Sequence, residues 1–270
     1  MPSENVTLSE PDRRTRKRVA RRDALLDLAA DLVERDGVAG VTMAALAEAA
    51  DYATASLYTY FPSRSALLAA LQQRALATLA QVARDHVQAW DAALAAASPA
   101  PSRRIAALAR LWAFSDLFLA APDRHPREFR LQQQLLVTPG AEETHDAATV
   151  VPAAMVVLDV PRRLLGEATE VRALEAGPTT TDPVGQPLDP TLVRTFAWVV
   201  ALNGALMVDS LTTGLPSTGP ALGDELTGAL LRGWGARPGE LAAARDLAHQ
   251  LATLPDPVAA TDPNLPSQEA

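Results

Sequence analysis

The sequence has 270 residues, of which 48% are hydrophobic and only 4% aromatic, and it makes heavy use of alanine and leucine. This composition favours helices, no stretch alternates as a strand would, and the absence of cysteine excludes disulfides and thiolate metal sites. The net charge of −8 is uneven: residues 1–74 balance ten basic against ten acidic side chains, so residues 75–270 carry the whole excess.

The N-terminal segment is strongly basic after a short start that lacks periodicity. Residues 13–22 hold seven positive charges and no negative one. A charge run is often only a solvated tail, but directly before a DNA-binding unit such an arm commonly reaches phosphates or the minor groove. We therefore expect residues 1–20 to form a flexible basic arm. Its expected DNA contacts are Arg13, Arg14, Arg16, Lys17, Arg18 and Arg21.

A first helix is predicted from about Arg21 to Arg35, with Gly37 ending it. Thr42 then has the position of an N-cap, with Val41 and Leu46 placed as a hydrophobic staple. A short helix follows this cap, and a second short helix runs from about Thr54 to Tyr60. Ser63 then caps the next helix. Two short helices joined by a tight turn are the helix-turn-helix unit, whose second helix lies in the DNA major groove.

Residues 22–75 resemble the DNA-binding domain of the TetR (tetracycline-repressor) family of bacterial transcriptional regulators. The strongest match is Leu57-Tyr58-Thr59-Tyr60-Phe61-Pro62-Ser63-Arg64 followed by Leu67-Leu68, and weaker matches are Val41-Thr42-Met43 and Leu46-Ala47-Glu48-Ala49-Ala50. The resemblance covers about a fifth of the chain. It implies base contacts near Thr54, Ala55 and Ser56 and backbone contacts at Tyr58, Tyr60 and Arg64. The full set expected to touch DNA also includes Thr42, Met43 and Thr59.

Three residues depart from the family pattern. Asp51 stands where glycine is usual, and aspartate tolerates the left-handed conformation that such a turn can require. Ala53 replaces the usual Ser cap, at a cost of about 1 kcal/mol unless Thr54 takes over as cap. Thr54 stands where a basic residue is common. We expect these departures to weaken the hold on phosphates while leaving the fold intact.

The C-terminal part is expected to be a helical regulatory and dimerisation domain over residues 76–254, after a DNA-binding domain over 21–75. The expected helices are Ser63 to about Ala97, Arg103 to Ala120, Pro126 to Val137, Glu142 to Ala176 with a kink or break at Pro152 or Pro161, Thr191 to Leu215, Leu222 to Trp234, and Glu240 to Leu254. The breaks between them are Ser98–Pro101 and a loop over Gly177–Pro190. Residues 255–270 are expected to be a flexible tail.

The helix from Thr191 is apolar on more than one face, so it must be covered on both sides. In the resembled family, two late helices pair with their copies to form a four-helix dimer interface. The residues expected there are Phe196, Val200, Met207, Leu226 and Leu230. The longest apolar stretch, Phe196 to Val208, contains Asn203 and is shorter than a bilayer span, so we expect no membrane partner.

The four histidines are scattered, without metal-binding spacing, and no glycine-rich loop could cradle a phosphate. We therefore expect no catalytic site, no metal and no cofactor. A ligand pocket between helices is more plausible. The pool of residues expected to line it contains Trp112, Phe118, Phe129, Gln133, Met155, Trp198 and Asn203, although most such residues in any helical domain are ordinary core.

Together these patterns predict an all-α fold with an N-terminal helix-turn-helix domain and a larger helical domain. The predicted function is a cytoplasmic, ligand-responsive transcriptional regulator, more often a repressor than an activator. Its expected partners are a near-palindromic double-stranded operator, an unidentified small-molecule effector and a second copy of the chain. The alternative is a helical sensor or interaction module that has lost specific DNA binding, and a helical enzyme is a distant third.

Overall fold

The computed structural model describes residues 13–137, 144–208 and 218–257, which form eleven helices and one two-stranded hairpin. The predicted all-α class is confirmed. The chain divides into two compact units. The N-terminal unit consists of residues 1–75 and 130–151, and the body unit consists of residues 76–129 and 152–270.

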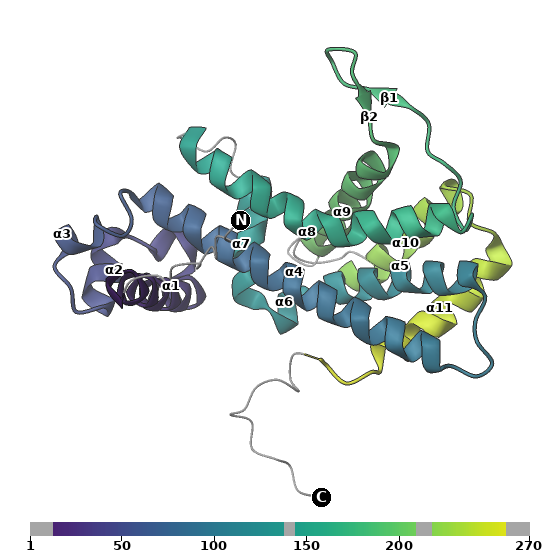
Figure 1. Ribbon diagram of the computed structural model, residues 1–270, viewed down its shortest axis with the longest axis horizontal. Coiled ribbons are helices and arrows are strands. Elements are labelled where there is room, and N and C mark those ends of the chain that lie inside the picture. Colours follow the sequence, from purple (N-terminus) through teal and green to yellow (C-terminus); the bar gives the residue numbers. More distant parts are fainter. Residues whose placement is uncertain (1–12, 138–143, 209–217, 258–270) are drawn as a thin grey trace, which may run out of the picture. The chain divides into compact units, whose positions relative to one another are not determined.

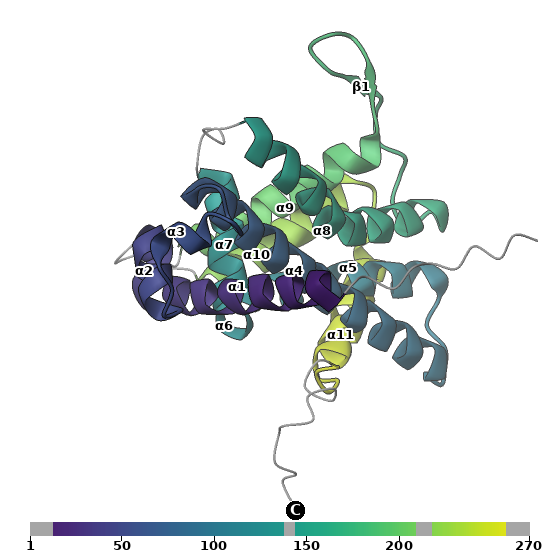
Figure 2. The same cartoon turned by 60° about the vertical axis from the view of Figure 1, so that its left-hand side comes forward.

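The N-terminal unit is built on α1 (Arg13–Gly40), α2 (Met43–Ala49), α3 (Thr54–Leu57) and the start of α4 (Arg64–Ala96). Figure 2 shows α1 from the side, with α2 beside its C-terminal end. The core of the unit is made of apolar side chains that are at most 2% exposed, among them Leu25, Leu46, Leu57, Phe61 and Leu67. These residues recur at helical spacing, so the periodicity that predicted the helices also forms the core.

The first helix begins at Arg13, so the prediction that it starts near Arg21 is wrong. Arginine, lysine and alanine are good helix formers, and no glycine or proline interrupts residues 13–36, so nothing stops the helix from extending backwards. Residues 13–20 are therefore part of α1, while residues 1–12 of the predicted arm lie outside the described residues. At the other end, Gly37 leaves the helical conformation with a φ of 71°, at the residue predicted to end the helix.

The helix α4 begins as predicted, because the Ser63 hydroxyl accepts a hydrogen bond from the Ala66 amide at 3.0 Å. It continues to Ala96, a length of about 50 Å at the helical rise of about 1.5 Å per residue. Residues up to Ala75 belong to the N-terminal unit and those from Leu76 to the body unit. Within the N-terminal unit, Arg74 fastens α4 to α1 by donating to Asp27 at 2.7 Å and to the Leu26 carbonyl at 2.8 Å.

The body unit is organised around α5 (Arg103–Leu119), which is buried on nearly every side. It packs against α10 (Gly219–Gly233) and α11 (Pro238–Ala252), and α10 in turn packs against α9 (Pro190–Val208). A helix of this kind must be apolar on most of its surface, and the residues between Ile105 and Leu119 are apolar except for Arg110, Ser115 and Asp116. The unit also contains α6 (Ala121–Arg124) and parts of α7 (Pro126–Val137) and α8 (Thr144–Glu170).

A buried polar contact joins three of these helices. The Trp198 indole N–H donates to the Ser115 hydroxyl at 3.1 Å, and this hydroxyl lies 2.9 Å from the hydroxyl of Thr227. All three side chains are buried, and each polar atom has a partner, so the contact avoids the cost of an unsatisfied polar group in the core.

The region around Pro152 and Pro161 is a single helix, α8, and both prolines lie inside it. Of the predicted kink or break, the break is therefore wrong, and the kink stays a prediction. Val160, Leu164 and Leu165 of the same helix are buried in the core of the body unit. We attribute the continuity of the helix to this packing, because tertiary contacts can outweigh the local cost of proline.

The segment 177–190, predicted to be a loop, contains a small antiparallel hairpin in which Thr180–Thr181 (β1) pairs with Pro187–Leu188 (β2). Figure 1 shows it projecting beyond the helices of the body unit. Its turn is held by the Asp182 carboxylate, which accepts hydrogen bonds from the Val184 and Gln186 amides at 3.0 and 2.8 Å. Gly185 supplies the positive φ of 82° that the turn requires.

The helix α9 buries one face and exposes another. Trp198 and Leu202 are at most 1% exposed, whereas Val193, Phe196, Val200 and Met207 are 38–59% exposed. By length and composition α9 could cross a membrane, which corrects the expectation that no stretch is long enough, although the core helix of a soluble protein passes the same test. The predicted end of this helix near Leu215 lies outside the described residues.

Tyrosine and tryptophan are found in different units. All three tyrosines, Tyr52, Tyr58 and Tyr60, belong to the N-terminal unit, whereas the tryptophans all belong to the body unit. These tryptophans are Trp90, Trp112, Trp198 and Trp234.

Candidate nucleic-acid interface

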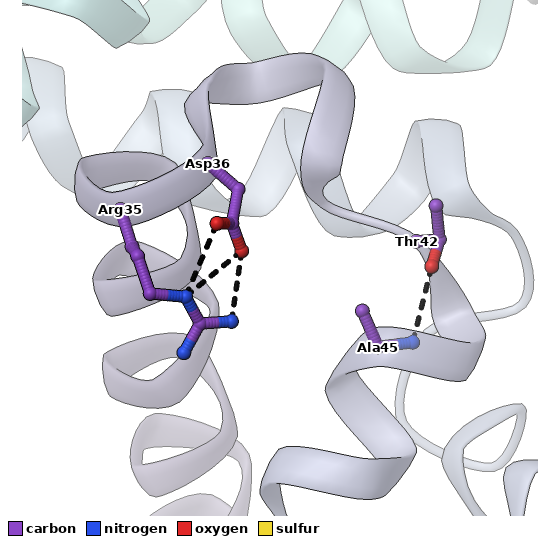
Figure 3. A network of polar contacts seen from close by, with 4 residues as sticks. All are labelled: Arg35, Asp36, Thr42 and Ala45. Atoms are coloured by element: carbon purple, nitrogen blue, oxygen red, sulfur yellow. Dashed lines mark hydrogen bonds and ion pairs between the residues drawn. The ribbon is translucent and has the colours of Figure 1, made fainter.

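The helix-turn-helix begins with a side-chain cap. The Thr42 hydroxyl accepts a hydrogen bond from the Ala45 amide at 3.0 Å, as Figure 3 shows, and this confirms the predicted N-cap of α2. Val41 and Leu46 are both fully buried, as expected of a hydrophobic staple. The cap satisfies one amide at the helix start, and the staple fixes the direction in which the chain enters α2.

The tight connection before this cap leaves little space. A Cβ atom on Gly40 would lie 2.4 Å from the Cβ of Asp36, so only glycine fits there without a shift. The Arg35 guanidinium donates a hydrogen bond from Nη2 to Oδ2 of the Asp36 carboxylate at 2.8 Å (Figure 3). This hydrogen bond lowers the pKa of Asp36. The pair is exposed to solvent, so it contributes little to stability.

The turn between α2 and α3 has the two features expected from the sequence. Asp51 adopts the left-handed conformation with a φ of 55°, in the position where glycine is usual. Ala53 is the N-cap of α3, and no side chain caps this helix, so Thr54 does not replace the missing serine. The recognition helix therefore starts with an amide that only solvent or a ligand can satisfy.

The face of α3 that points to solvent is small and neutral. Thr54, Ala55 and Ser56 are exposed, as are Tyr58 and Thr59 beyond the helix, whereas Leu57 and Phe61 are at most 1% exposed and belong to the core. Such side chains can contact a thymine methyl or make single hydrogen bonds, but they lack the bidentate reach of arginine to guanine.

Two of the predicted contact residues have structural roles, and for Arg64, which is exposed, the phosphate contact stays a prediction. The Met43 side chain is only 8% exposed and packs in the core of the unit, which corrects the prediction that it meets DNA. Arg64 donates to the Val41 carbonyl at 2.6 Å and to the Val38 carbonyl at 2.9 Å, so its guanidinium fastens the loop before α2. Tyr60 is half-buried against the same core.

The basic run lies along α1, and its C-terminal members fold back onto the helix-turn-helix. Arg18 donates to the Thr59 carbonyl at 3.3 Å, and Arg21 and Arg22 lie over the rings of Tyr52 and Phe61. Four charges nearer the N-terminus make no hydrogen bond or ion pair with the described part of the chain, and all are exposed: Arg13, Arg14, Arg16 and Lys17. These four are available to neutralise phosphates.

A groove of about 500 Å³ separates this part of α1 from the turn, lined among others by Lys17, Arg21 and Tyr52. Tyr52 was not among the residues predicted to contact DNA. No local pattern places it beside Lys17 and Arg21, because it comes from a separate segment of the chain.

In the body unit, the residues of the predicted ligand pool do not share one described cavity. Phe118 and Phe129 stack edge to face with ring centroids 6.3 Å apart, Trp112 and Trp198 are buried in the core, and Asn203 donates to the Val199 carbonyl at 2.8 Å. Gln133 belongs to the N-terminal unit.

Met155 is the exception. It is 40% exposed and lines an open cleft of about 530 Å³ within the body unit. Arg84 and Arg162 line the same cleft. The assignment of a ligand site to the predicted pool stays a prediction.

Of the predicted dimer residues, Phe196, Val200 and Met207 are exposed on α9, while Leu226 and Leu230 are partly buried against the core of their own unit. Within the described residues, no group of three or more histidine, aspartate or glutamate side chains could hold a metal ion.

Comparison with known proteins agrees with this geometry. Residues 25–71 match the model of the family described as bacterial regulatory proteins, tetR family, so the predicted resemblance is confirmed and the N-terminal unit contains a helix-turn-helix domain of this type. No curated protein matches the sequence.

Three solved structures, all less than 25% identical in sequence, share the fold. A protein of unknown function from Rhodococcus sp. RHA1 matches with a TM-score of 0.55 and 22% identity over 79% of this chain and 94% of its own. SmeT, described as the repressor of the Stenotrophomonas maltophilia multidrug efflux pump SmeDEF, matches with a TM-score of 0.54 and 18% identity over 81% and 92%. RolR in complex with resorcinol matches with a TM-score of 0.51 and 21% identity over 87% and 95%.

Proposed function

We propose that the protein is a ligand-responsive transcriptional regulator that binds an operator in double-stranded DNA as a homodimer. One observation carries the proposal: the exposed face of α3 and the unpaired charges of α1 belong to the same compact unit. A helix that can enter the major groove and positive charges that can hold phosphates are the two parts that specific DNA binding requires.

A homodimer is supported by the exposed apolar face of α9, which carries Phe196 and Val200. An apolar stripe of this length on a soluble protein is normally covered by a partner, and a second copy provides a matching stripe. Two copies place two α3 helices on a near-palindromic operator, whose half-sites must lie about 34–36 Å apart or a multiple of it.

Repression and response to a small molecule are supported by the shared fold, since SmeT is described as a repressor and RolR was solved with resorcinol. The effector is proposed to bind among the helices of the body unit, with no cofactor and no catalysis. Because α4 contains residues of both units, a shift of this helix on ligand binding would change the spacing of the two recognition helices. The proposed location is the cytoplasm, where the operator is.

The decisive experiment is selection of bound fragments from a random DNA library with the full-length protein, followed by sequencing. Enrichment of a near-palindromic site, bound more weakly as salt rises, is the expected result. If no sequence is enriched and binding to all fragments is equal, the proposed function is wrong.

The second candidate is a helical small-molecule sensor that has lost specific DNA binding. It is favoured by the uncapped start of α3 and by the absence of any basic residue between Asp51 and Arg64. The same selection separates the two, because a sensor of this kind would still bind its ligand but would enrich no DNA sequence.

A further inference from the structure

A small cavity in the body unit, separate from the predicted ligand pool, is lined by one carboxylate, two aromatic rings and the exposed side chain of Arg124. It has a volume of about 60 Å³ and lies between α4, α5, α6 and the segment that follows α11. His86 and Trp90 come from α4, Asp116 comes from α5, and Leu254 comes from the C-terminal segment. The volume is that of about two water molecules, so the cavity admits a group of two or three non-hydrogen atoms.

Among the polar side chains that line this cavity, Asp116 and His86 offer hydrogen-bond acceptors, whereas the exposed Arg124 offers only donors. The half-buried Asp116 side chain makes no hydrogen bond or ion pair with any residue in the described ranges. His86 is 8% exposed, and its Nδ1 lies 2.9 Å from the Val82 carbonyl, which can only accept, so Nδ1 carries the proton. In the neutral ring the other nitrogen, Nε2, is therefore an acceptor.

The charges around Asp116 do not neutralise it. Burial raises the pKa of the Asp116 carboxyl to about 6, while His249 and Arg245 act to lower the pKa and Asp224 acts to raise it. Arg245 is already paired with Asp224. The other charged or titratable groups lining the cavity or next to it are His86, Asp256, which lies 3.9 Å from the His86 ring, and the exposed Arg124.

We propose that this cavity binds the head of a small primary amine in its protonated form. An ammonium group has three N–H donors and no acceptor, which matches a lining of carboxylate and imidazole acceptors. Its charge compensates the partly desolvated carboxylate. The proposal goes beyond DNA binding and does not depend on it.

The segment after α11 forms one wall of the site. Leu254, Pro255 and Pro257 line the cavity, so a ligand longer than the cavity must pass or displace this segment. The head group is therefore selected by the cavity, whereas the length of the attached chain is limited by the C-terminal segment.

The test uses the full-length protein without DNA and ethylammonium chloride as the probe. Ethylammonium is expected to raise the melting temperature in a saturable way, beyond equal concentrations of sodium chloride. Ethanol, which has a similar size and no charge, is expected to have no such effect. Binding measured by NMR titration should weaken by about tenfold from pH 7 to pH 5, because protonation removes the carboxylate charge. No saturable effect of ethylammonium, or an equal effect of ethanol, would overturn the proposal.

Two variants locate the site. Asp116→Asn removes the charge at nearly constant shape, and Ala113→Val keeps the charge but fills the cavity that Ala113 lines. Both should lose binding, while Asp123→Asn on the exposed surface of α6 should bind as the unaltered protein does. Undiminished binding by a folded Asp116→Asn protein would refute the site. Operator binding is measured separately, so failure here and failure of the proposed function can be told apart.

Discussion

The exposed faces of α3 and α9 are both open to solvent, yet they differ in chemistry. Thr54, Ala55 and Ser56 on α3 are small and polar or neutral, so water satisfies them well. Phe196 and Val200 on α9 are apolar, so their exposure to water is unfavourable. This difference in chemistry is why we propose an apolar partner, a second copy of the chain, for α9 and a polar partner, DNA, for α3.

The largest expected effect comes from changing the α9 face. Phe196→Asp together with Val200→Asp should give monomers, because charges on this face would be buried against a partner without compensation. DNA affinity should then fall by at least about a hundredfold, since each half-site is bound alone. Sedimentation and operator titration measure the two effects.

The matched control for this pair is Val184→Asp in the hairpin, where the residue is 79% exposed but lies off the helix face. It should leave the dimer intact. An unaltered protein that is monomeric at the concentrations used for binding would remove the basis of the comparison.

The second largest expected effect concerns the salt dependence of DNA binding. Arg13, Arg14 and Arg16 carry charges without a partner in the described residues, and α3 carries none. Changing all three to glutamine should flatten the slope of log affinity against log salt by about 5 for the dimer, at about 0.9 per phosphate contact. A salt titration on one operator measures this slope.

The control changes Arg103, Arg172 and Arg237 of the body unit to glutamine, which alters the net charge equally. These arginines are exposed, and their loss should leave the slope unchanged. Parallel slopes for the first variant and the unaltered protein would show that the start of α1 is only solvated surface.

The third prediction concerns the cap that holds the helix before α3. Thr42→Ala removes the hydrogen bond to the Ala45 amide and should lower the free energy of unfolding of the N-terminal unit by about 1 kcal/mol. Thr42→Ser keeps the hydroxyl and should lower it much less. Urea unfolding followed by circular dichroism compares them, and equal midpoints would show that the cap adds no stability.

The smallest expected effect is a gain in stability. Ala53→Ser supplies the side-chain cap that α3 lacks and should raise stability by up to about 1 kcal/mol. Ala55→Ser places the same hydroxyl in the helix, where it cannot cap, and should not stabilise. If the two variants unfold alike, the N-cap position of α3 is not the weak point of the recognition helix.

How far the sequence could predict each region follows from the range of the interactions involved. Caps and turns are local, so Thr42, Asp51 and Ala53 behave as their neighbours in the sequence imply. The guanidinium of Arg64 contacts carbonyls 23 and 26 residues away, and no local pattern distinguishes this role from a phosphate contact.

The same distinction applies to the body unit. Its helices were predicted from periodicity, but the continuity of α8 through Pro161 depends on packing in the core. The hairpin at Thr180–Leu188 was missed because each strand has only two residues, too few to show alternation. The cavity beside Asp116 combines residues from α4 to the C-terminal segment, a combination that exists only in the folded chain.

The division of tyrosine and tryptophan between the units gives the chain two optical signals of separate origin. Emission excited at the red edge of the absorption band comes from tryptophan alone and therefore from the body unit, whereas the tyrosines of the N-terminal unit can be followed by their ultraviolet difference absorption. Coincident unfolding curves from the two signals would show that the units unfold together, and separate curves would give each unit its own stability without any label. Trp90 lies at the amine cavity, so quenching or a spectral shift on titration would also place a bound ligand beside it.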